Sequence, residues 1–225
     1  SQWVEGRELA KLPLPQPLPV ALSIMQQLFS AIGFLHDKGI VHRDIKPENI
    51  ILNNEGRVLL IDFGSAFSKD LSSGQTFTGT FRYCEPRFLE GKPTGMSADV
   101  YAASMVQAEL LVGKLSLPDG APVDLYRFLT GHFKNHLNEI LLGSFPPMAE
   151  HSMMALCDPE RIETNTARHI AIEYQEYLQQ IFNDSAENIL KQIVCDGANE
   201  PGFNAALLKL AQQRANSSTT TKRKA

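Results

Sequence analysis

The sequence predicts an α+β fold that is mostly helical and includes one small β-hairpin. Three observations lead to this prediction. Apolar residues recur at spacings of three and four across 22–35, as an amphipathic helix requires. Two short apolar segments, 50–52 and 58–61, flank Asn53-Asn54-Glu55-Gly56, a junction that favours a tight hairpin. A second helical stretch, 97–112, is apolar over most of its surface and is expected to be buried.

The remaining elements follow in chain order. Residues 1–19 contain four prolines, which exclude a continuous helix there. Gly39 supplies a stop for the first helix, and Gly113 closes the second. Residues 64–82 show no sustained period and are expected to form a loop, and the polar, basic end 214–225 is expected to be disordered. Further helices are expected around 122–142, 150–157, 166–182, 184–194 and 203–213.

Composition excludes several classes of protein. The 225 residues, 43% of them hydrophobic, suffice for one large domain or two small ones. A net charge of −4 provides no basic field, so nucleic acid is not an expected partner. The three cysteines lie far apart, which argues against a zinc site and favours a reducing, cytoplasmic location. The longest apolar runs are far below the roughly 18 residues that span a bilayer, so no membrane segment is expected. The chain opens with Ser1 rather than Met, so we expect it to be part of a longer protein.

Four polar residues carry the chemistry of the sequence. Asp44, Lys46, Asn49 and Asp62 are a carboxylate, an ammonium group, an amide and a second carboxylate. Phosphoryl transfer needs such a set: a base for the attacking hydroxyl, a cation for the moving phosphoryl group and oxygen ligands for magnesium. Asp44 and Lys46 stand two apart on extended chain, which directs both side chains to the same side. The hairpin between Asn49 and Asp62 is expected to bring those two residues into one metal site.

These residues belong to two motifs of a known family. HRDIKPEN resembles the catalytic loop of eukaryotic-type serine/threonine protein kinases, and DFG resembles their magnesium-binding motif. The resemblance implies a protein-kinase-like fold, with this chain supplying the mostly helical large C-terminal lobe. It also implies ATP and Mg²⁺ as cofactors. Asp44 would deprotonate the substrate hydroxyl, Lys46 would steady the γ-phosphate, and Asn49 and Asp62 would hold Mg²⁺. The alternative is a surface loop with coincidental charges.

The resemblance extends to a nucleotide-binding segment near the N-terminus. Gln2-Trp3-Val4 resembles the hinge strand that binds adenine through its backbone, so Gln2 and Val4 are expected to contact the nucleotide. Glu8 falls where many kinases contact the ribose, and Ile51 falls where an apolar side chain floors the adenine. The alternative is that these are ordinary core and surface residues.

The resemblance also extends downstream. GTFRYCEPRFLEG resembles the end of the activation loop, and its Thr80, together with Lys46, is the serine/threonine pattern, so Thr80 joins the expected catalytic residues. SADVYAASMVQAELLVGK resembles the long central helix of the large lobe, in which Asp99 is expected to accept hydrogen bonds from the backbone near His42 and Arg43. His42 and Phe63 are expected to pack together behind the site.

Arg43, directly before Asp44, suggests a kinase whose activation loop is ordered by phosphate, because a guanidinium group can grip phosphate through two hydrogen bonds. The candidate phosphate acceptors are hydroxyl side chains between 65 and 80, and the alternative is that they are simply solvated. They are Ser72, Ser73, Thr76 and Thr78.

The sequence departs from the kinase pattern in three places. No GxGxxG occurs in the chain, and the hinge begins at residue 2, so the small lobe is expected to be absent and residues 1–225 alone are expected to show negligible phosphotransfer. Arg87 replaces the glutamate of the Ala-Pro-Glu motif, and we expect it to pair with Glu160 or Asp158 or to point to solvent. The region after 119 continues for longer than in typical kinases, as helices that pack on the lobe or dock a partner.

These inferences combine into one domain layout and one function. Residues 1–165 are expected to form the C-terminal kinase lobe, 166–213 a helical extension, and 214–225 a disordered basic tail. The expected function is ATP-dependent phosphorylation of Ser and Thr hydroxyls on protein substrates. The alternative from another class is a pseudokinase or scaffold, a lobe retained for binding other proteins.

Overall fold

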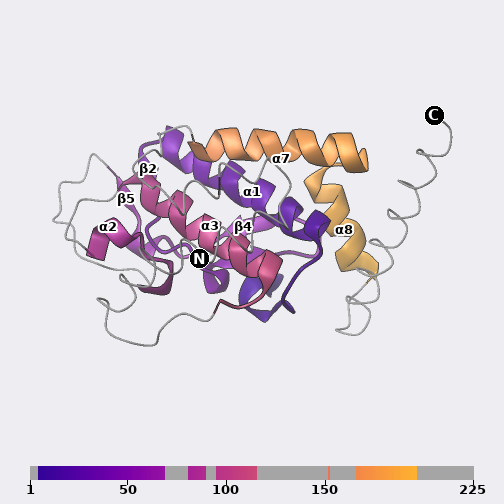
Figure 1. Ribbon diagram of the computed structural model, residues 1–225, viewed down its shortest axis with the longest axis horizontal. Coiled ribbons are helices and arrows are strands. Elements are labelled where there is room, and N and C mark those ends of the chain that lie inside the picture. The colour runs from indigo at the N-terminus through magenta and orange to yellow at the C-terminus, as the bar shows by residue number, and fades with distance from the viewer. Residues whose placement is uncertain (1–4, 69–80, 90–94, 116–151, 153–165, 197–225) are drawn as a thin grey trace.

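The computed structural model describes residues 5–68, 81–89, 95–115, 152 and 166–196 (Figure 1). These ranges contain a long helix near the N-terminus, two small antiparallel sheets and three further helices of eleven or more residues together with shorter turns. The elements are β1 (Arg7–Glu8), η1 (Leu9–Lys11), α1 (Leu18–Asp37), β2 (Ile40–Val41), η2 (Pro47–Asn49), β3 (Ile50–Leu52), β4 (Val58–Leu60), η3 (Phe63–Ser65), β5 (Phe67–Ser68), η4 (Phe81–Tyr83), α2 (Pro86–Leu89), α3 (Met96–Val112), α7 (Thr166–Phe182) and α8 (Ala186–Asp196).

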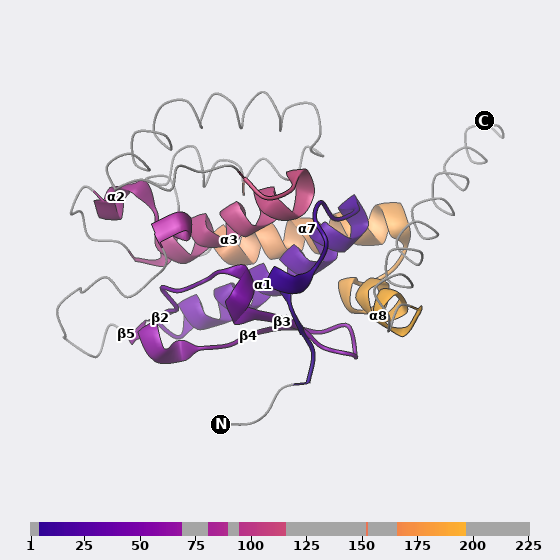
Figure 2. The ribbon, with the colours of Figure 1, turned by 90° about the horizontal axis from the view of Figure 1, so that it is seen from below.

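Helix α1 is the centre of the hydrophobic core. It contacts α3, α7, α8 and β4, and eleven of its twenty residues are buried. Figures 1 and 2 show α7 lying along one side of α1, with α3 on another. The edge of the Phe29 ring meets the ring of Tyr174 with 6.1 Å between centroids. Residues from α1, α3, α7, α8, β3 and β4 share one core.

The expectation of no membrane segment stays a prediction, because α1 passes a test of length and hydropathy for a membrane span. This helix is long enough, and its mean hydropathy of 1.6 over 18 residues is high enough, to cross a membrane. Within the described structure 56% of that stretch is buried, and the central helix of a folded domain has the same properties. Ser23, Gln26 and Gln27 interrupt the apolar runs of this segment, so the length of those runs does not reveal its high mean hydropathy.

Helix α1 begins four residues before the predicted stretch and ends where Gly39 was expected to stop it. Pro17 caps its start and Pro19 lies in the first turn, where proline removes no helical hydrogen bond. Gly39 has a φ of +69°, and its N–H donates to the His36 carbonyl at 2.9 Å. The prolines therefore determine where the helix starts, but the last of them, Pro19, lies inside the helix.

Helix α3 confirms the prediction of a buried second helix. It spans Met96–Val112, within one residue of the expected start, and it ends at Gly113 with a φ of +97°. Twelve of its residues are buried, including the charged Asp99 and Glu109. A buried carboxylate is costly unless it is paired or hydrogen-bonded, so both side chains must have strong partners.

The predicted hairpin is present and belongs to a three-stranded antiparallel sheet in the order β1-β3-β4. Ile50 pairs with Leu60 and Leu52 with Val58, and the turn between them is closed by Asn53, whose Oδ1 accepts from the Arg57 N–H at 2.8 Å. Gly56 has a φ of +79°, and a Cβ there would meet the Lys191 nitrogen at 2.4 Å, so only glycine fits beside α8.

A second sheet lies in a region that the sequence analysis expected to be a loop. Phe67–Ser68 of β5 pair with Ile40–Val41 of β2, and η3 precedes them. Strands of two residues carry no readable period, so the loop predicted over 64–82 did not include β5 at Phe67–Ser68. Short 3-10 turns also occupy part of that range, at the end of η3 and at η4. This pairing places residues 67–68, which follow Phe63, beside residues 40–41, which precede His42.

Helices α7 and α8 confirm the predicted stretches 166–182 and 184–194, and they pack on the lobe as expected. Gly33 of α1 lies against the backbone of Arg168, where an added Cβ would stand 3.2 Å from the Arg168 nitrogen.

The other expected helices, 122–142, 150–157 (but for Ser152) and 203–213, and the expected disorder of 214–225 lie outside the described residues. The domain boundary after 165 stays a prediction.

Candidate active site

A short turn after β2 gathers three of the four predicted polar residues. Asp44 is 8% exposed, and its Oδ2 accepts from Lys46 Nζ at 2.8 Å and from Asn49 Nδ2 at 2.9 Å. Asn49 Nδ2 also donates to the Asp44 carbonyl at 2.8 Å. The 3-10 turn η2, with Pro47 in its first position, brings the amide back to the carboxylate. One carboxylate oxygen therefore meets an ammonium group and an amide in a largely buried setting.

Asp99 of α3 holds the chain just before this cluster, as the sequence predicted. Its two carboxylate oxygens accept from the backbone N–H groups of His42 and Arg43, each at 2.8 Å. Asp99 is 1% exposed, so these bonds to a charged group are of the stronger kind. Arg43 has a φ of +66°, a conformation that costs a non-glycine residue energy, and the Asp99 carboxylate helps to hold it there.

His36 is a member of this network that the sequence analysis missed. Its Nε2 lies 3.0 Å from Asp99 Oδ2, and the side chain is buried. The sequence held a signal for it: His36 follows Phe29 and Ile32 by seven and four positions and so falls on the apolar face of the first helix. A polar side chain on a buried face needs a partner, and the partner is the carboxylate that braces the turn.

Asp62 lies at the end of the hairpin, in a different setting from Asp44. A hydrogen bond of 2.9 Å from the Ile61 N–H to the Asn49 carbonyl brings the two segments together. Asp62 itself is exposed, has a φ of +64°, and accepts from the Gly64 N–H at 3.2 Å. Across the ranges that the structure describes, no hydrogen bond or ion pair joins Asp62 to Asp44, Lys46 or Asn49.

His42 and Phe63 connect these two segments, and their predicted contact is confirmed. Their rings meet edge to face with 4.9 Å between centroids. His42 Nε2 donates to the Ile61 carbonyl at 3.1 Å, while its Nδ1 lies 3.4 Å from the Asp44 N–H. His42 thus contacts both the chain that carries Asp44 and the chain that carries Asp62.

Arg43 uses its guanidinium group within the same region. Its Nε donates to the Ser65 carbonyl at 2.6 Å, and the group stands over the Phe67 ring at 5.4 Å from the centroid. The proposed phosphate acceptors between 72 and 78 lie outside the described residues, so the role of Arg43 toward phosphate stays a prediction.

Two of the predicted nucleotide-binding residues are cross-strand neighbours. Glu8 of β1 stands opposite Ile51 of β3 in the antiparallel register. Glu8 Oε1 accepts from Lys11 Nζ at 2.8 Å, and Ile51 is 7% exposed. Gln2, Val4 and Thr80 lie outside the described residues, so their predicted contacts are not placed.

Arg87 has an acidic neighbour that the sequence analysis did not consider. Its Nη1 lies 3.8 Å from Oε1 of Glu85, a residue that is 1% exposed and that accepts from the Ser97 hydroxyl at 2.9 Å. Asp158 and Glu160, the expected partners, lie outside the described residues. Among the described residues, the carboxylate beside Arg87 is therefore that of Glu85, two positions earlier in the chain.

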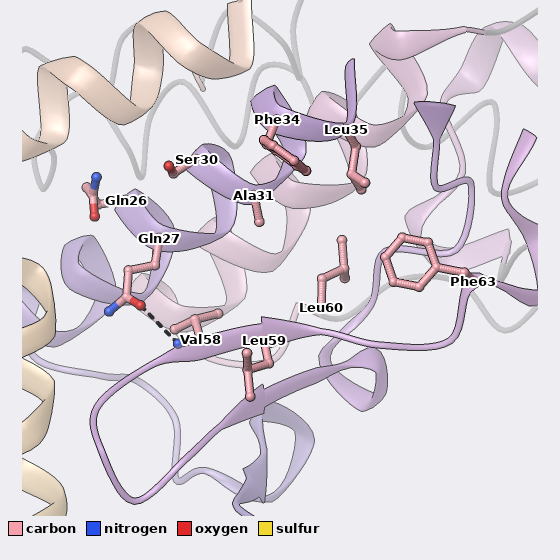
Figure 3. Close-up of a pocket in the computed structure, with 10 residues that line it drawn as sticks. All are labelled: Gln26, Gln27, Ser30, Ala31, Phe34, Leu35, Val58, Leu59, Leu60 and Phe63. Carbon is pink, nitrogen blue, oxygen red and sulfur yellow. Dashed lines mark hydrogen bonds between the residues drawn. The ribbon is translucent and has the colours of Figure 1, made fainter. Parts of the chain in front are cut away.

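An apolar groove runs between α1 and β4, beside the polar cluster rather than over it. Its volume is about 570 Å³, and Figure 3 shows Phe63 at one end, facing Leu60. The Gln27 side chain binds the edge of β4 through hydrogen bonds to the Gly56 carbonyl and the Val58 N–H. Its lining within the described ranges is uncharged and consists of Gln26, Gln27, Ser30, Ala31, Phe34, Leu35, Val58, Leu59, Leu60 and Phe63.

The donor atoms at the site suit a hard divalent cation. Both side-chain hydrogen bonds that Asn49 makes to described residues use Nδ2, so neither engages the Oδ1 that a metal would take. The exposed Asp62 carboxylate is a second oxygen donor. No group of three His, Cys, Asp or Glu side chains is placed to hold a metal within the described ranges. Magnesium commonly takes only one or two protein oxygens and completes its shell with phosphate and water, so these residues fit it.

Comparison with known proteins agrees with this geometry. The family model "Protein kinase domain" matches residues 17–195. Calcium/calmodulin-dependent protein kinase type 1 of Caenorhabditis elegans is 34% identical over 146 residues, which cover 62% of this chain and 41% of that protein. The mouse PAS domain-containing serine/threonine-protein kinase is 50% identical over 78 residues, 33% of this chain and 6% of the relative. The chain thus spans less than half the length of these relatives.

Proposed function

The chain belongs to the protein kinase family, and on that premise we propose that the full-length protein transfers the γ-phosphoryl group of ATP to Ser and Thr hydroxyls of protein substrates. The observation that carries this proposal is the convergence of Lys46 Nζ and Asn49 Nδ2 on one oxygen of the buried Asp44 carboxylate. The names of the relatives, which include serine/threonine-protein kinases, support the substrate class.

In this proposal Asp44 is the base. As the substrate oxygen bonds to the γ-phosphorus, its proton passes to the Asp44 carboxylate, and the bond from that phosphorus to the bridging oxygen of ADP breaks. Lys46 places its positive charge 2.8 Å from the carboxylate and can turn toward the transferring phosphoryl group. The buried Asp99 acts through the backbone of His42 and Arg43, so it is a positioning residue.

We propose Mg²⁺ as the metal and Asn49 Oδ1 and the Asp62 carboxylate as its protein ligands. When bound, the ion neutralises charge on the phosphate oxygens. Asn49 is held by two side-chain bonds to Asp44, whereas the Asp62 side chain, among the described residues, has a single bond, from Gly64. The two ligands therefore differ in how far the protein fixes them.

Several further predictions remain proposals of the same account. Gln2, Val4, Glu8 and Ile51 would hold the nucleotide, and Thr80 would join the catalytic residues. A partner protein could dock on α7, where Ile172 is 47% exposed and Ile181 is 58% exposed. A cytoplasmic location is supported by the wide separation of the three cysteines in the sequence.

The scaffold alternative would use the lobe only for protein binding. The groove between α1 and β4 could serve that purpose without any of the polar residues. A scaffold has no need for a buried carboxylate that meets both an ammonium group and an amide, because each buried polar group must be compensated. This consideration favours the enzyme.

The test is phosphate transfer from radiolabelled ATP by the full-length protein. We expect transfer to a Ser/Thr peptide mixture by the wild type, and a loss of about 10³-fold in Asp44→Asn, which removes the base. Asp37→Asn, an exposed acid at the end of α1, is the matched control and should keep full activity. Equal rates for wild type and Asp44→Asn would overturn the proposal.

A further inference from the structure

The chain between η4 and α2 is attached to α3 at two places that lie far apart on the helix. Near the end of α3, Glu109 accepts from Arg82 Nε at 3.0 Å and from the Tyr83 hydroxyl at 2.9 Å. In the first turn of α3, the Ser97 hydroxyl donates to Glu85 Oε2 at 2.9 Å. Ser97 and Glu109 are twelve positions apart, which is about 18 Å along a helix. The two attachments therefore act on different ends of α3.

Glu85 connects its segment to both α2 and α3. Its carbonyl accepts from the Phe88 N–H at 3.0 Å, at the start of α2. Its side chain reaches α3 and is fully buried. A buried carboxylate is costly unless it is compensated, and the Ser97 hydroxyl and the Arg87 guanidinium group, 3.8 Å from Oε1, contribute to that compensation. The position of Glu85 is thus fixed through its backbone and its side chain.

This acid does not belong to the motif that the chain shares with protein kinases. The Ala-Pro-Glu motif has alanine where this chain has Glu85, and it has glutamate where this chain has Arg87. The hydrogen bond between Ser97 and Glu85 is therefore a feature of this chain that does not follow from its membership of the family.

The first turn of α3 needs an anchor because the residue in its cap position has no side chain. Gly95 cannot accept from the free N–H groups of that turn as a serine or aspartate side chain would. Ser97 is the second residue of the helix, so the Glu85 carboxylate lies at the end of α3 where negative charge is favourable. Glu85 thus holds the end of the helix that its own cap residue leaves open.

Asp99 lies in the same first turn of α3. Its two carboxylate oxygens accept from the backbone N–H groups of His42 and Arg43 at 2.8 Å each, and Asp44 is the next residue in the chain. If this turn of α3 frayed, Asp99 would move with it, and the chain before Asp44 would lose its brace. Each step from Glu85 to Asp44 is thus either a hydrogen bond of the structure or a short stretch of chain.

We propose that Glu85 is a positioning residue for the phosphoryl transfer: by holding the first turn of α3 through the Ser97 hydroxyl, it keeps Asp99 against the backbone that precedes Asp44. The inference rests on the proposed function, because the reaction at Asp44 is part of it. The attachment at Glu109 lies about 15 Å further along α3 than Asp99 and has no such effect.

The test is Ser97→Ala in the full-length protein, because this variant removes the hydroxyl and leaves both carboxylates in place. Amide hydrogen exchange at His42 and Arg43, followed by NMR, should become at least about tenfold faster. The kcat of phosphate transfer should fall about tenfold, since a small displacement of a reacting group is costly, and KM for ATP should change by less than about twofold. Ser97→Thr restores a hydroxyl and should bring exchange and kcat to within about twofold of the wild type.

Ser104→Ala is the matched control, because it removes another serine hydroxyl from the same helix. That hydroxyl is buried and donates to the Val100 carbonyl at 2.8 Å, within α3 itself. The control should leave kcat and the exchange at His42 and Arg43 unchanged.

A second variant keeps the inference testable if Ser97→Ala does not fold. Glu85→Gln keeps an acceptor for the Ser97 hydroxyl and removes the negative charge at the start of α3. Exchange at His42 and Arg43 should then be about threefold faster, and unchanged exchange in this variant would overturn the role of Glu85.

The outcomes separate this inference from the proposed function. Unchanged exchange at His42 and Arg43 in Ser97→Ala, or an equal increase in Ser104→Ala, overturns the positioning role whether or not phosphate is transferred. Failure of Ser97→Thr to restore slow exchange, or faster exchange with an unchanged kcat, overturns it as well. Faster exchange in Ser97→Ala alone, rescued by Ser97→Thr, in a protein that transfers no phosphate supports the hold on Asp99 and overturns the proposed function.

Discussion

The two acids of the candidate site, Asp44 and Asp62, are held in very different ways. Asp44 is 8% exposed and shares one oxygen between Lys46 and Asn49, while the chain before it is braced by Asp99. Asp62 is exposed and accepts from Gly64, two positions along its own turn. One acid is positioned by the protein before any ligand binds, and the other has room to move toward a metal. The comparison indicates that the proposed base is preorganised, whereas the site of the proposed metal ligand is completed by what binds there.

The largest expected effect comes from Asp62 and falls on activity alone. Asp62→Asn tolerates the left-handed backbone but removes a metal oxygen, so we expect kcat to fall about 10³-fold. The free energy of unfolding should change by less than about 0.5 kcal/mol, because the side chain is exposed. Steady-state phosphate transfer and urea unfolding measure the two quantities. A large loss of stability would show that Asp62 is held as firmly as Asp44.

The next effect falls on stability and comes from Asp99. Asp99→Asn places an amide N–H₂ against one of the backbone donors of His42 and Arg43 and removes the partner charge near His36. We expect the free energy of unfolding to fall by about 3 kcal/mol, measured by urea denaturation. Asp37→Asn, which breaks only an exposed pair with Arg168, should cost less than about 1 kcal/mol. Equal losses in the two variants would contradict the bracing role of Asp99.

A smaller change of stability is expected at Asn49. Asn49→Ala removes two hydrogen bonds to Asp44 in a buried turn, which should lower the free energy of unfolding by about 1–2 kcal/mol. Comparison with Asp62→Asn under the same denaturation conditions sharpens the contrast, since both residues are proposed metal ligands. The contrast would be lost if the two variants were equally stable.

The smallest effect concerns Cys84 at high pH. Burial, and then the Glu85 charge, raise the pKa of the Cys84 thiol from 9.0 to about 12. Because folding raises this pKa, the neutral thiol stabilises the fold below about pH 9, and that contribution is lost as the pH rises toward about 12. At pH 8.5, alkylation of Cys84 should be much slower in the native protein than in urea, as resolved by peptide mass spectrometry. Equal rates would show that the thiol is accessible and unshifted.

The sequence predicted those parts of the fold whose patterns are long. The helices predicted at 22–35 and 97–112 and the hairpin at 50–61 are all present, and both helices end at their predicted glycine stops, although α1 begins four residues early. The two-residue strands β2 and β5 could not be predicted, because a period of two cannot be read from two residues. Their pairing depends on how the chain folds back after Phe63.

The candidate site was predictable where neighbours in sequence are neighbours in space. Asp44, Lys46 and Asn49 lie within six positions, and the contact between His42 and Phe63 follows from the two motifs. His36 was missed because its partner, Asp99, lies 63 positions away in another helix. The pairing of Arg82 with Glu109 was also missed, since nothing local to GTFRYCEPR shows that the acid in α3 is buried beside it.

Amide hydrogen exchange in the ligand-free protein, followed by NMR, tests the contrast between the two acids most directly. The amides of His42 and Arg43, which donate to the buried Asp99 carboxylate, should exchange at least about 10³-fold more slowly than the amide of Gly64, which donates to the exposed Asp62 carboxylate. Comparable exchange rates at these three amides would contradict a turn that the protein holds in place before its ligands arrive.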